Sequence, residues 1–272
     1  AAAVADLAQS LRDNDLVRFS KLSVPTPVYA RFEQRWEEQK AAAGEISDED
    51  RASFAEGLGR LTAPDAEATL YAELEPSLIQ FETEMAPQLP LMVAMGSGFA
   101  TASIQQNETL SESQKQHATA LIGALAGWIT TAPLGDREKA REAIGVAVRT
   151  ARGLDIEDAD QMRALSFEQA MQKGGQVSGG LKGVLAIYGL DVDATLDSVK
   201  AERVSMNGDN ARVKVSYSLA GTPVSFEMDM VRRDGGWYSP ELIANAEEQL
   251  DAPLVDEDHF GHEEHDEDAA GE

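Results

Sequence analysis

Three histidines and several carboxylates stand at a regular spacing near the C-terminus, in the stretch DEDHFGHEEHDED. His259, His262 and His265 are three residues apart, so successive pairs would lie near one face of a helix. With Glu263, these side chains offer the nitrogen and oxygen ligands that zinc, copper or nickel accepts. The sequence therefore raises divalent-metal binding as one possible function.

The composition of the same segment favours another interpretation. Residues 251–272 contain ten acids, no Lys or Arg, and only three large apolar residues, Leu254, Val255 and Phe260. Such a stretch buries too little apolar surface to order itself, so we predict a disordered acidic tail over 251–272. A specific metal site draws its ligands from elements fixed by a core. We therefore expect no cofactor, apart from weak divalent-metal association at this tail.

Two other patterns approach known templates without fulfilling them. DVDATLDSVKAE puts oxygen ligands at calcium-loop positions but lacks the glycine of that loop's sharp turn, so we expect a helix-to-strand linker with solvated acids. KGGQVSGGLKG, residues 173–183, lacks the adjacent Gly-Lys-Ser/Thr of a phosphate-binding loop. We therefore expect this glycine-rich segment to be a flexible hinge.

Enzymatic chemistry leaves little trace in this chain. There is no cysteine, which excludes disulfides and thiolate chemistry, and no Gly-x-Ser-x-Gly nucleophile elbow. His117, the only histidine outside the tail, is expected to be structural. With 48 acids in the chain, any proposed acid–base pair stands at chance level. We predict a non-enzymatic protein, and keep a hydrolase with a site built from distant acids as an alternative.

Charge and hydropathy limit the classes of partner and the cellular locations to consider. The 272 residues carry a net charge of −25, so nucleic acid and anionic lipid are disfavoured partners. Two nearly uncharged segments, 86–107 and 116–135, have apolar parts shorter than the ~20 residues a bilayer needs. The chain begins AAAVADLAQS without Met, which leads us to expect an exported protein, periplasmic or lipid-anchored at the outer membrane, with the cytoplasm as the alternative.

The elements that position any site change character near residue 198. Apolar residues recur at helical period before about 190, which predicts a body of seven or eight helices over 1–190. The uncharged segments predict a helical hairpin at the centre of the helical core, because their glycines and alanines let two backbones approach closely. Residues 191–250 predict an antiparallel meander and a closing helix that pack on this body. The fold class is thus α+β.

The meander alternates apolar and polar residues. Val213, Val215 and Tyr217 alternate with Lys214 and Ser216, and a second strand, VSFEMDMV, repeats the pattern before DGGWY. Residues 198–240 resemble the closing sheet of exported bacterial lipoprotein domains with a cystatin-like or nuclear-transport-factor-2-like cone, which are of unknown function. The resemblance implies an exported domain but assigns no functional residue.

Aromatic residues supply the remaining candidate site. We predict that a protein or a small ligand binds at the interface between helices and sheet. The residues expected to line it are Trp128, Tyr188, Tyr217, Trp237 and Tyr238. The identity of the ligand and the oligomeric state do not follow from the sequence.

Overall fold

A computed structural model describes residues 1–253 of the chain. Helices make up most of this part, and a four-stranded antiparallel sheet follows them towards the C-terminal end. The predicted α+β class is therefore confirmed. The metal-ligand candidates His259, His262, Glu263 and His265 lie outside the described residues, as does the tail from residue 254 onward.

Eleven α-helices precede the sheet in residues 1–253, and ten of them lie within residues 1–190, where the sequence predicts seven or eight. They are α1 (Ala2–Arg12), α2 (Leu16–Ser23), α3 (Thr26–Ala42), α4 (Asp48–Thr62), α5 (Ala66–Gln80), α6 (Leu89–Gln106), α7 (Glu112–Thr131), α8 (Arg137–Gly153), α9 (Ala159–Ala164), α10 (Phe167–Ile187) and α11 (Val192–Asp197). The predicted number is too low because α2 and α9 have only eight and six residues, too few for a periodic apolar stripe.

Local chemistry explains where several helices begin. A capping box begins α7: the Gln114 N–H donates to Ser111 Oγ at 3.3 Å, and the Ser111 N–H donates to Gln114 Oε1 at 2.9 Å. Asp136 caps α8 by accepting from the backbone N–H groups of Glu138 and Lys139. Pro76 lies inside α5, which ends in a π-helical turn, η1 (Phe81–Met85).

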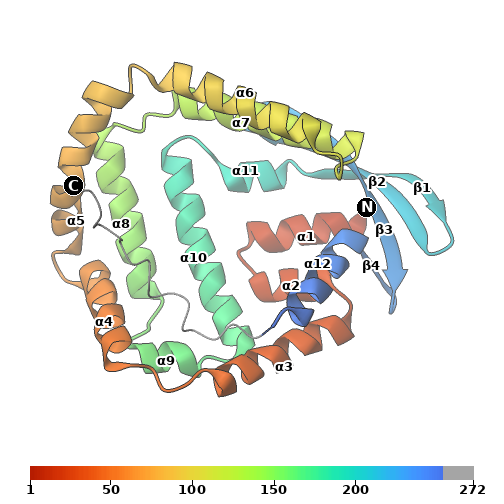
Figure 1. The fold of residues 1–272 in the computed structure, drawn as a ribbon, viewed down its shortest axis with the longest axis horizontal. Coiled ribbons are helices and arrows are strands. Elements are labelled where there is room, and N and C mark those ends of the chain that lie inside the picture. The colour runs from red at the N-terminus through yellow and green to blue at the C-terminus, as the bar shows by residue number, and fades with distance from the viewer. Residues whose placement is uncertain (254–272) are drawn as a thin grey trace, which may run out of the picture.

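The helices enclose a central pair (Figure 1). α8 and α10 run side by side through the middle, with α3 crossing one of their ends, α4 and α5 beside α8, and the α6–α7 hairpin over the opposite ends. α1, α2 and the closing helix α12 (Pro240–Asp251) fill the space between α10 and the sheet. Among the helices of residues 1–253, none combines the length and apolarity needed to cross a bilayer.

The sheet is the predicted meander. Its strands β1 (Lys200–Asn207), β2 (Asn210–Leu219), β3 (Thr222–Arg233) and β4 (Gly236–Tyr238) lie in sequence order. Val213 pairs with Met228 and Val215 with Phe226, so apolar side chains share one face. Val213, Val215 and Met230 form a buried cluster with Val4 of α1. A second cluster joins Val28 and Tyr29 of α3 to Ala246 and Leu250 of α12.

Two glycine-rich regions differ from their predictions. The α6–α7 hairpin is not the centre of the core, because α6 has no buried residue and lies at the edge of the molecule (Figure 1). Residues 173–183 are not a hinge but the middle of the continuous helix α10. Their glycines allow close packing: a Cβ on Gly175 would lie 2.1 Å from the Asn14 carbonyl oxygen, and one on Gly180 would lie 2.3 Å from Thr150 Oγ1.

Candidate functional site

A pocket of about 940 Å³ opens among the helices at the end of the α8–α10 pair. It is bounded by the C-terminal half of α3, the start of α4, the segment from the end of α8 through α9, and α10. Its lining is mostly apolar, and the large apolar side chains are Trp36, Ile46, Phe54, Leu154, Ile156, Met162, Leu165 and Val177. Both size and lining are typical of small-molecule sites, which usually measure ~300–1,000 Å³.

Trp36 fixes one wall of this pocket. Its Nε1–H donates to the Leu165 carbonyl at 2.9 Å, and its ring meets Phe167 edge to face at 6.1 Å between centroids. Lys40, one turn further along α3, donates to the same carbonyl at 3.2 Å. The C-terminal half of α3 is thus held against the α9–α10 junction without any need for a ligand.

Three cations line this pocket on a strongly acidic protein: Lys40, Arg163 and Lys173. Lys40 is paired with Glu37 at 2.9 Å. Arg163 Nη2 donates to the carbonyls of Lys40 and Ala43, and Lys173 Nζ donates to the Leu154 carbonyl. Among residues 1–253, neither Arg163 nor Lys173 pairs with a carboxylate in the structure.

These carbonyl contacts position the cations without neutralising them. A lysine ammonium carries three donors and an arginine guanidinium five, so each retains donors beyond its backbone contacts. The one lining carboxylate, Asp50, accepts from Ser47 Oγ at 2.6 Å at the start of α4. The nearby Asp160 accepts a hydrogen bond from Arg51, and this bond holds the pKa of Asp160 below its usual range. The pocket is therefore apolar with a net positive wall.

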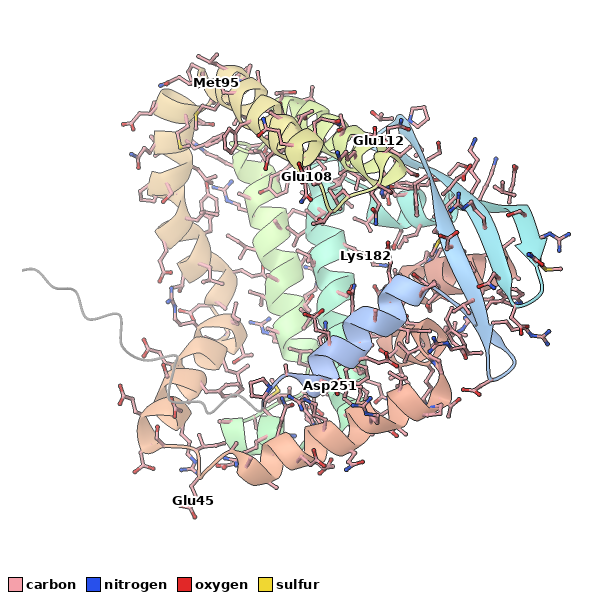
Figure 2. All side chains as sticks on the ribbon, turned by 45° about the vertical axis from the view of Figure 1, so that its right-hand side comes forward. Glu45, Met95, Glu108, Glu112, Lys182 and Asp251 are labelled. Atoms are coloured by element: carbon pink, nitrogen blue, oxygen red, sulfur yellow. The ribbon has the colours of Figure 1, made fainter. Side chains whose placement is uncertain are left out.

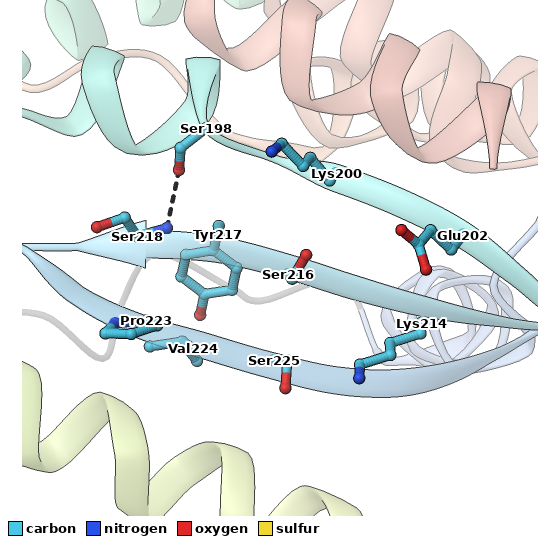
Figure 3. A pocket seen from close by; sticks show the side chains of 10 residues that line it. All are labelled: Ser198, Lys200, Glu202, Lys214, Ser216, Tyr217, Ser218, Pro223, Val224 and Ser225. Atoms are coloured by element: carbon cyan, nitrogen blue, oxygen red, sulfur yellow. Dashed lines mark hydrogen bonds between the residues drawn. The ribbon is translucent and has the colours of Figure 1, made fainter.

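A second hollow, of about 640 Å³, lies on the polar face of the sheet (Figure 3). It is lined by exposed side chains such as Lys200, Glu202 and Lys214, together with serines of β2 and β3. Lys214 stands between Glu202 and Glu227 in the strand register, so opposite charges face one another across the strands. This hollow is shallower and more polar than the helical pocket, and it offers a ligand little apolar surface.

The structure distributes the predicted aromatic site over separate places. Trp128 of α7 donates through Nε1 to the Tyr188 carbonyl at 2.8 Å, just after α10. Tyr217 and Trp237 pack against the buried cluster of the sheet, and the Tyr238 ring lies over Gly236 of the same strand. Of the five residues, Tyr217 lines the sheet hollow, and the lining of the helical pocket includes none of them. Binding at these aromatics stays a prediction.

His117 has the structural role expected from the sequence. Its Nε2 lies 2.8 Å from Tyr217 Oη, and its ring stacks on Phe226 with centroids 4.2 Å apart. Burial between α7 and the sheet lowers the pKa of His117, because the charged imidazolium would lose hydration there. The histidine thus joins the hairpin to the sheet.

The calcium-loop acids make structural contacts, and Asp191 and Asp197 are exposed, as the sequence predicts. Asp191 caps α11 by accepting from the Ala194 N–H at 2.8 Å, and Asp197 pairs with Arg12 at 3.1 Å. Asp193 accepts from the buried Lys182, which Figure 2 labels in the interior between α10 and its neighbours. Within residues 1–253, no group of three or more potential metal ligands gathers in space.

Lys182 also donates to the carbonyls of Leu11 and Arg12 at the end of α1, so its ammonium has three acceptors. Because every donor is satisfied by the protein, this buried lysine anchors α1 and α11 to α10 and offers nothing to a ligand.

Comparison with family models, curated proteins and solved structures finds no match for this chain. The resemblance of residues 198–240 to lipoprotein domains accordingly stays a prediction, as does export.

Sequence reasoning misses the helical pocket for a physical reason. Its cations stand at positions 40, 163 and 173, and only the packing of α3 against α9 and α10 brings them together. The available signal is the rarity of cations: Lys and Arg number 23 against 48 acids, so any local excess of them is informative.

Proposed function

We propose that this protein binds, without chemical conversion, a small molecule that has an apolar body and an anionic group. The observation that carries the proposal is the helical pocket, where a large apolar cavity meets Arg163 and Lys173. The apolar walls favour a hydrocarbon or aromatic body, and the cations favour a carboxylate or sulfonate. Their anchoring by backbone carbonyls pre-organises them, which lowers the entropic cost of binding.

The lining supports binding rather than a hydrolytic reaction at this pocket. Its acid groups amount to one carboxylate, Asp50, so the pocket holds no pair of carboxylates for acid–base work. Serine, threonine and histidine are likewise missing from its lining residues, so the pocket holds no hydroxyl nucleophile with a histidine base.

Calorimetric titration with two matched compounds tests the proposal. Dodecanoate supplies an apolar chain with a carboxylate, and dodecanol supplies the same chain without charge. We expect dodecanoate to bind at least tenfold more tightly, since a charge-assisted hydrogen bond contributes about 1.5–3 kcal/mol. Lys173→Met should remove most of that preference and leave dodecanol binding unchanged, whereas Lys173→Arg should retain it.

A cavity-filling substitution locates the site. Val177→Trp places a large ring in the pocket and should weaken both compounds, while Leu181→Trp, one turn further on α10 and outside the lining, should weaken neither. Equal affinity for the two compounds, or binding that ignores both Lys173→Met and Val177→Trp, would contradict the proposal.

A further inference from the structure

α6 exposes a continuous apolar face to solvent. Leu91, Met92, Met95 and Phe99 are 66, 49, 68 and 80 % exposed, and residues three, four, seven and eight apart share one side of a helix. Figure 2 shows Met95 at the outer edge of the molecule. Large side chains with this exposure, gathered on one helix, mark a contact surface rather than scattered surface residues.

The rest of the described chain does not cover this face. α6 packs along α7 through its other side, where Leu89, Val93 and Ile104 are half-buried. A Cβ added to Gly98, which shares the outer face, would meet no atom within 4 Å. The outer face of α6 is thus open, both at its large side chains and at its glycine.

We propose that this face binds the same face of a second copy of the chain, with the two α6 helices antiparallel and crossing at Met95. This inference is independent of the helical pocket, whose lining lies on α3, α4, α8 to α9 and α10.

The register of α6 is self-complementary about Met95. When Met95 faces its symmetry mate, positions whose residue numbers sum to 190 lie at the same height, and the two-fold axis keeps each flank of the face on its own side. At about 100° per residue, Met92 and Phe99 share one flank of this face and Leu91 and Gly98 share the other. Met92 therefore packs on Phe99 of the other copy, and Leu91 lies over Gly98, a position with no Cβ. Large residues therefore meet either each other or a gap, as close packing requires.

The available area suits a weak homodimer. The four side chains, with the small residues between them, expose on the order of 500 Å² of apolar surface, which is within the range of the largest patch on a typical monomer. Two copies would bury about 1,000 Å² in total, close to the lower bound for a specific interface. The dissociation constant should accordingly lie in the micromolar range.

Charge favours a second copy over a membrane or a charged partner. Residues 86–107 hold no ionisable side chain, so the contact brings no like charges together at its centre and offers nothing to a charged protein. Acids stand beyond both ends of α6, with Glu84 before it and Glu108 and Glu112 after it, the latter two labelled in Figure 2. These acids and the net charge of −25 repel anionic lipid.

Sedimentation velocity over a range of concentrations tests the inference. We expect the full chain to shift from monomer to dimer as its concentration rises to about 100 µM. Phe99→Glu should raise the dissociation constant at least tenfold, because it places two like charges in the apolar contact. Leu181→Glu, which changes a 58 % exposed leucine of α10, is the matched control and should leave the dimer intact.

Salt and lipid distinguish this dimer from an ion-paired contact and from binding to a bilayer. Raising the salt from about 50 mM to about 500 mM should tighten the dimer, since it screens the acids beyond the helix ends. A chain that stays monomeric throughout, or a dimer that Phe99→Glu leaves unchanged, would overturn the inference. A monomer that co-sediments with phosphatidylcholine vesicles would also overturn it and would assign the face to a bilayer surface.

Discussion

α10 and α6 are both long glycine-bearing helices, but they use their glycines in opposite surroundings. In α10, Cβ atoms on Gly175 and Gly180 would overlap Asn14 and Thr150, so the missing side chains allow neighbouring segments to approach. In α6, Gly96 and Gly98 have no heavy atom within 4 Å of where a Cβ would stand. One helix is packed through its glycines, whereas the other leaves them open.

The difference indicates where each helix finds its stabilising contacts. A glycine within a helix costs about 1 kcal/mol relative to alanine. Packing inside the monomer offsets that cost in α10, where the buried Lys182 adds further anchors. Nothing among residues 1–253 offsets it in α6, and the same face exposes Met95 and Phe99. A contact outside the monomer accounts for both features of α6.

The largest expected effect belongs to Gly175→Ala. The added methyl would overlap a backbone oxygen, which cannot rotate away, so α10 and the α1–α2 turn must separate. We expect a loss of about 3 kcal/mol in the free energy of unfolding, measured by urea denaturation. Gly57→Ala in α4, where the new Cβ meets nothing, is the control and should stabilise the chain instead. Similar losses for both would remove the contrast between packed and open glycines.

Lys182→Met should have the next largest effect. It leaves the carbonyls of Leu11 and Arg12 and the Asp193 carboxylate without their shared donor. We expect unfolding to become easier by about 2 kcal/mol, because a partly buried carboxylate is left unpaired. Lys200→Met, at an exposed position of β1, should stay within about 0.5 kcal/mol of the unmodified chain. Equal losses of unfolding free energy for the two variants would contradict the conclusion that Lys182 anchors α1 and α11 to α10.

Gly98→Ala, unlike the two preceding substitutions, should stabilise the monomer while it weakens the dimer. In a chain kept monomeric by Phe99→Glu, the new methyl points into open space, so higher helix propensity should stabilise the monomer by up to about 1 kcal/mol. In the unmodified chain the same methyl should weaken self-association, because it fills the gap that faces Leu91 of the second copy. Destabilisation of the monomer would show that Gly98 is packed within the chain.

The smallest effect concerns His117, on the packed side of the hairpin. Its lowered pKa means that the unfolded chain binds this proton more readily than the folded chain does. Stability should therefore be full above about pH 6.5, the ordinary histidine pKa, and fall as the pH decreases below it. His117→Gln should lose less stability than the unmodified chain between about pH 7.5 and about pH 5, as compared by urea denaturation. Parallel pH curves would place His117 in solvent.

Sequence reasoning can recover elements but not which surfaces meet. Strand alternation identifies the sheet and its faces correctly, because a period of two leaves one arrangement for Val213, Val215 and Phe226. The sequence prediction is wrong for both glycine-rich regions. Residues 173–183 are not a hinge, and the α6–α7 hairpin is not the centre of the core. Composition is similar in the two cases, and only the neighbours, which lie far away in the sequence, distinguish them.

The candidate site is even less accessible to sequence reasoning. The sequence predicts that aromatic residues gather at the sheet. The Trp128 indole instead donates to the backbone carbonyl of Tyr188, away from Tyr217 and Trp237. The sequence places Trp36, the tryptophan of the helical pocket, on an amphipathic helix and among the aromatics that could line a pocket between helices and sheet, not in a pocket among the helices alone. No local pattern indicates that its helix meets Arg163 and Lys173.

Cross-linking at single introduced cysteines tests most directly the claim that α6 pairs with a second copy of itself. The chain has no cysteine, so Met95→Cys and Leu181→Cys each introduce one thiol, at positions 68 and 58 % exposed. A disulfide needs Cα atoms within about 7 Å of each other, a distance that only the crossing point of the two helices provides. Mild oxidation should convert Met95→Cys to a covalent dimer and leave Leu181→Cys monomeric. Equal cross-linking at both positions, or none at position 95, would contradict the account.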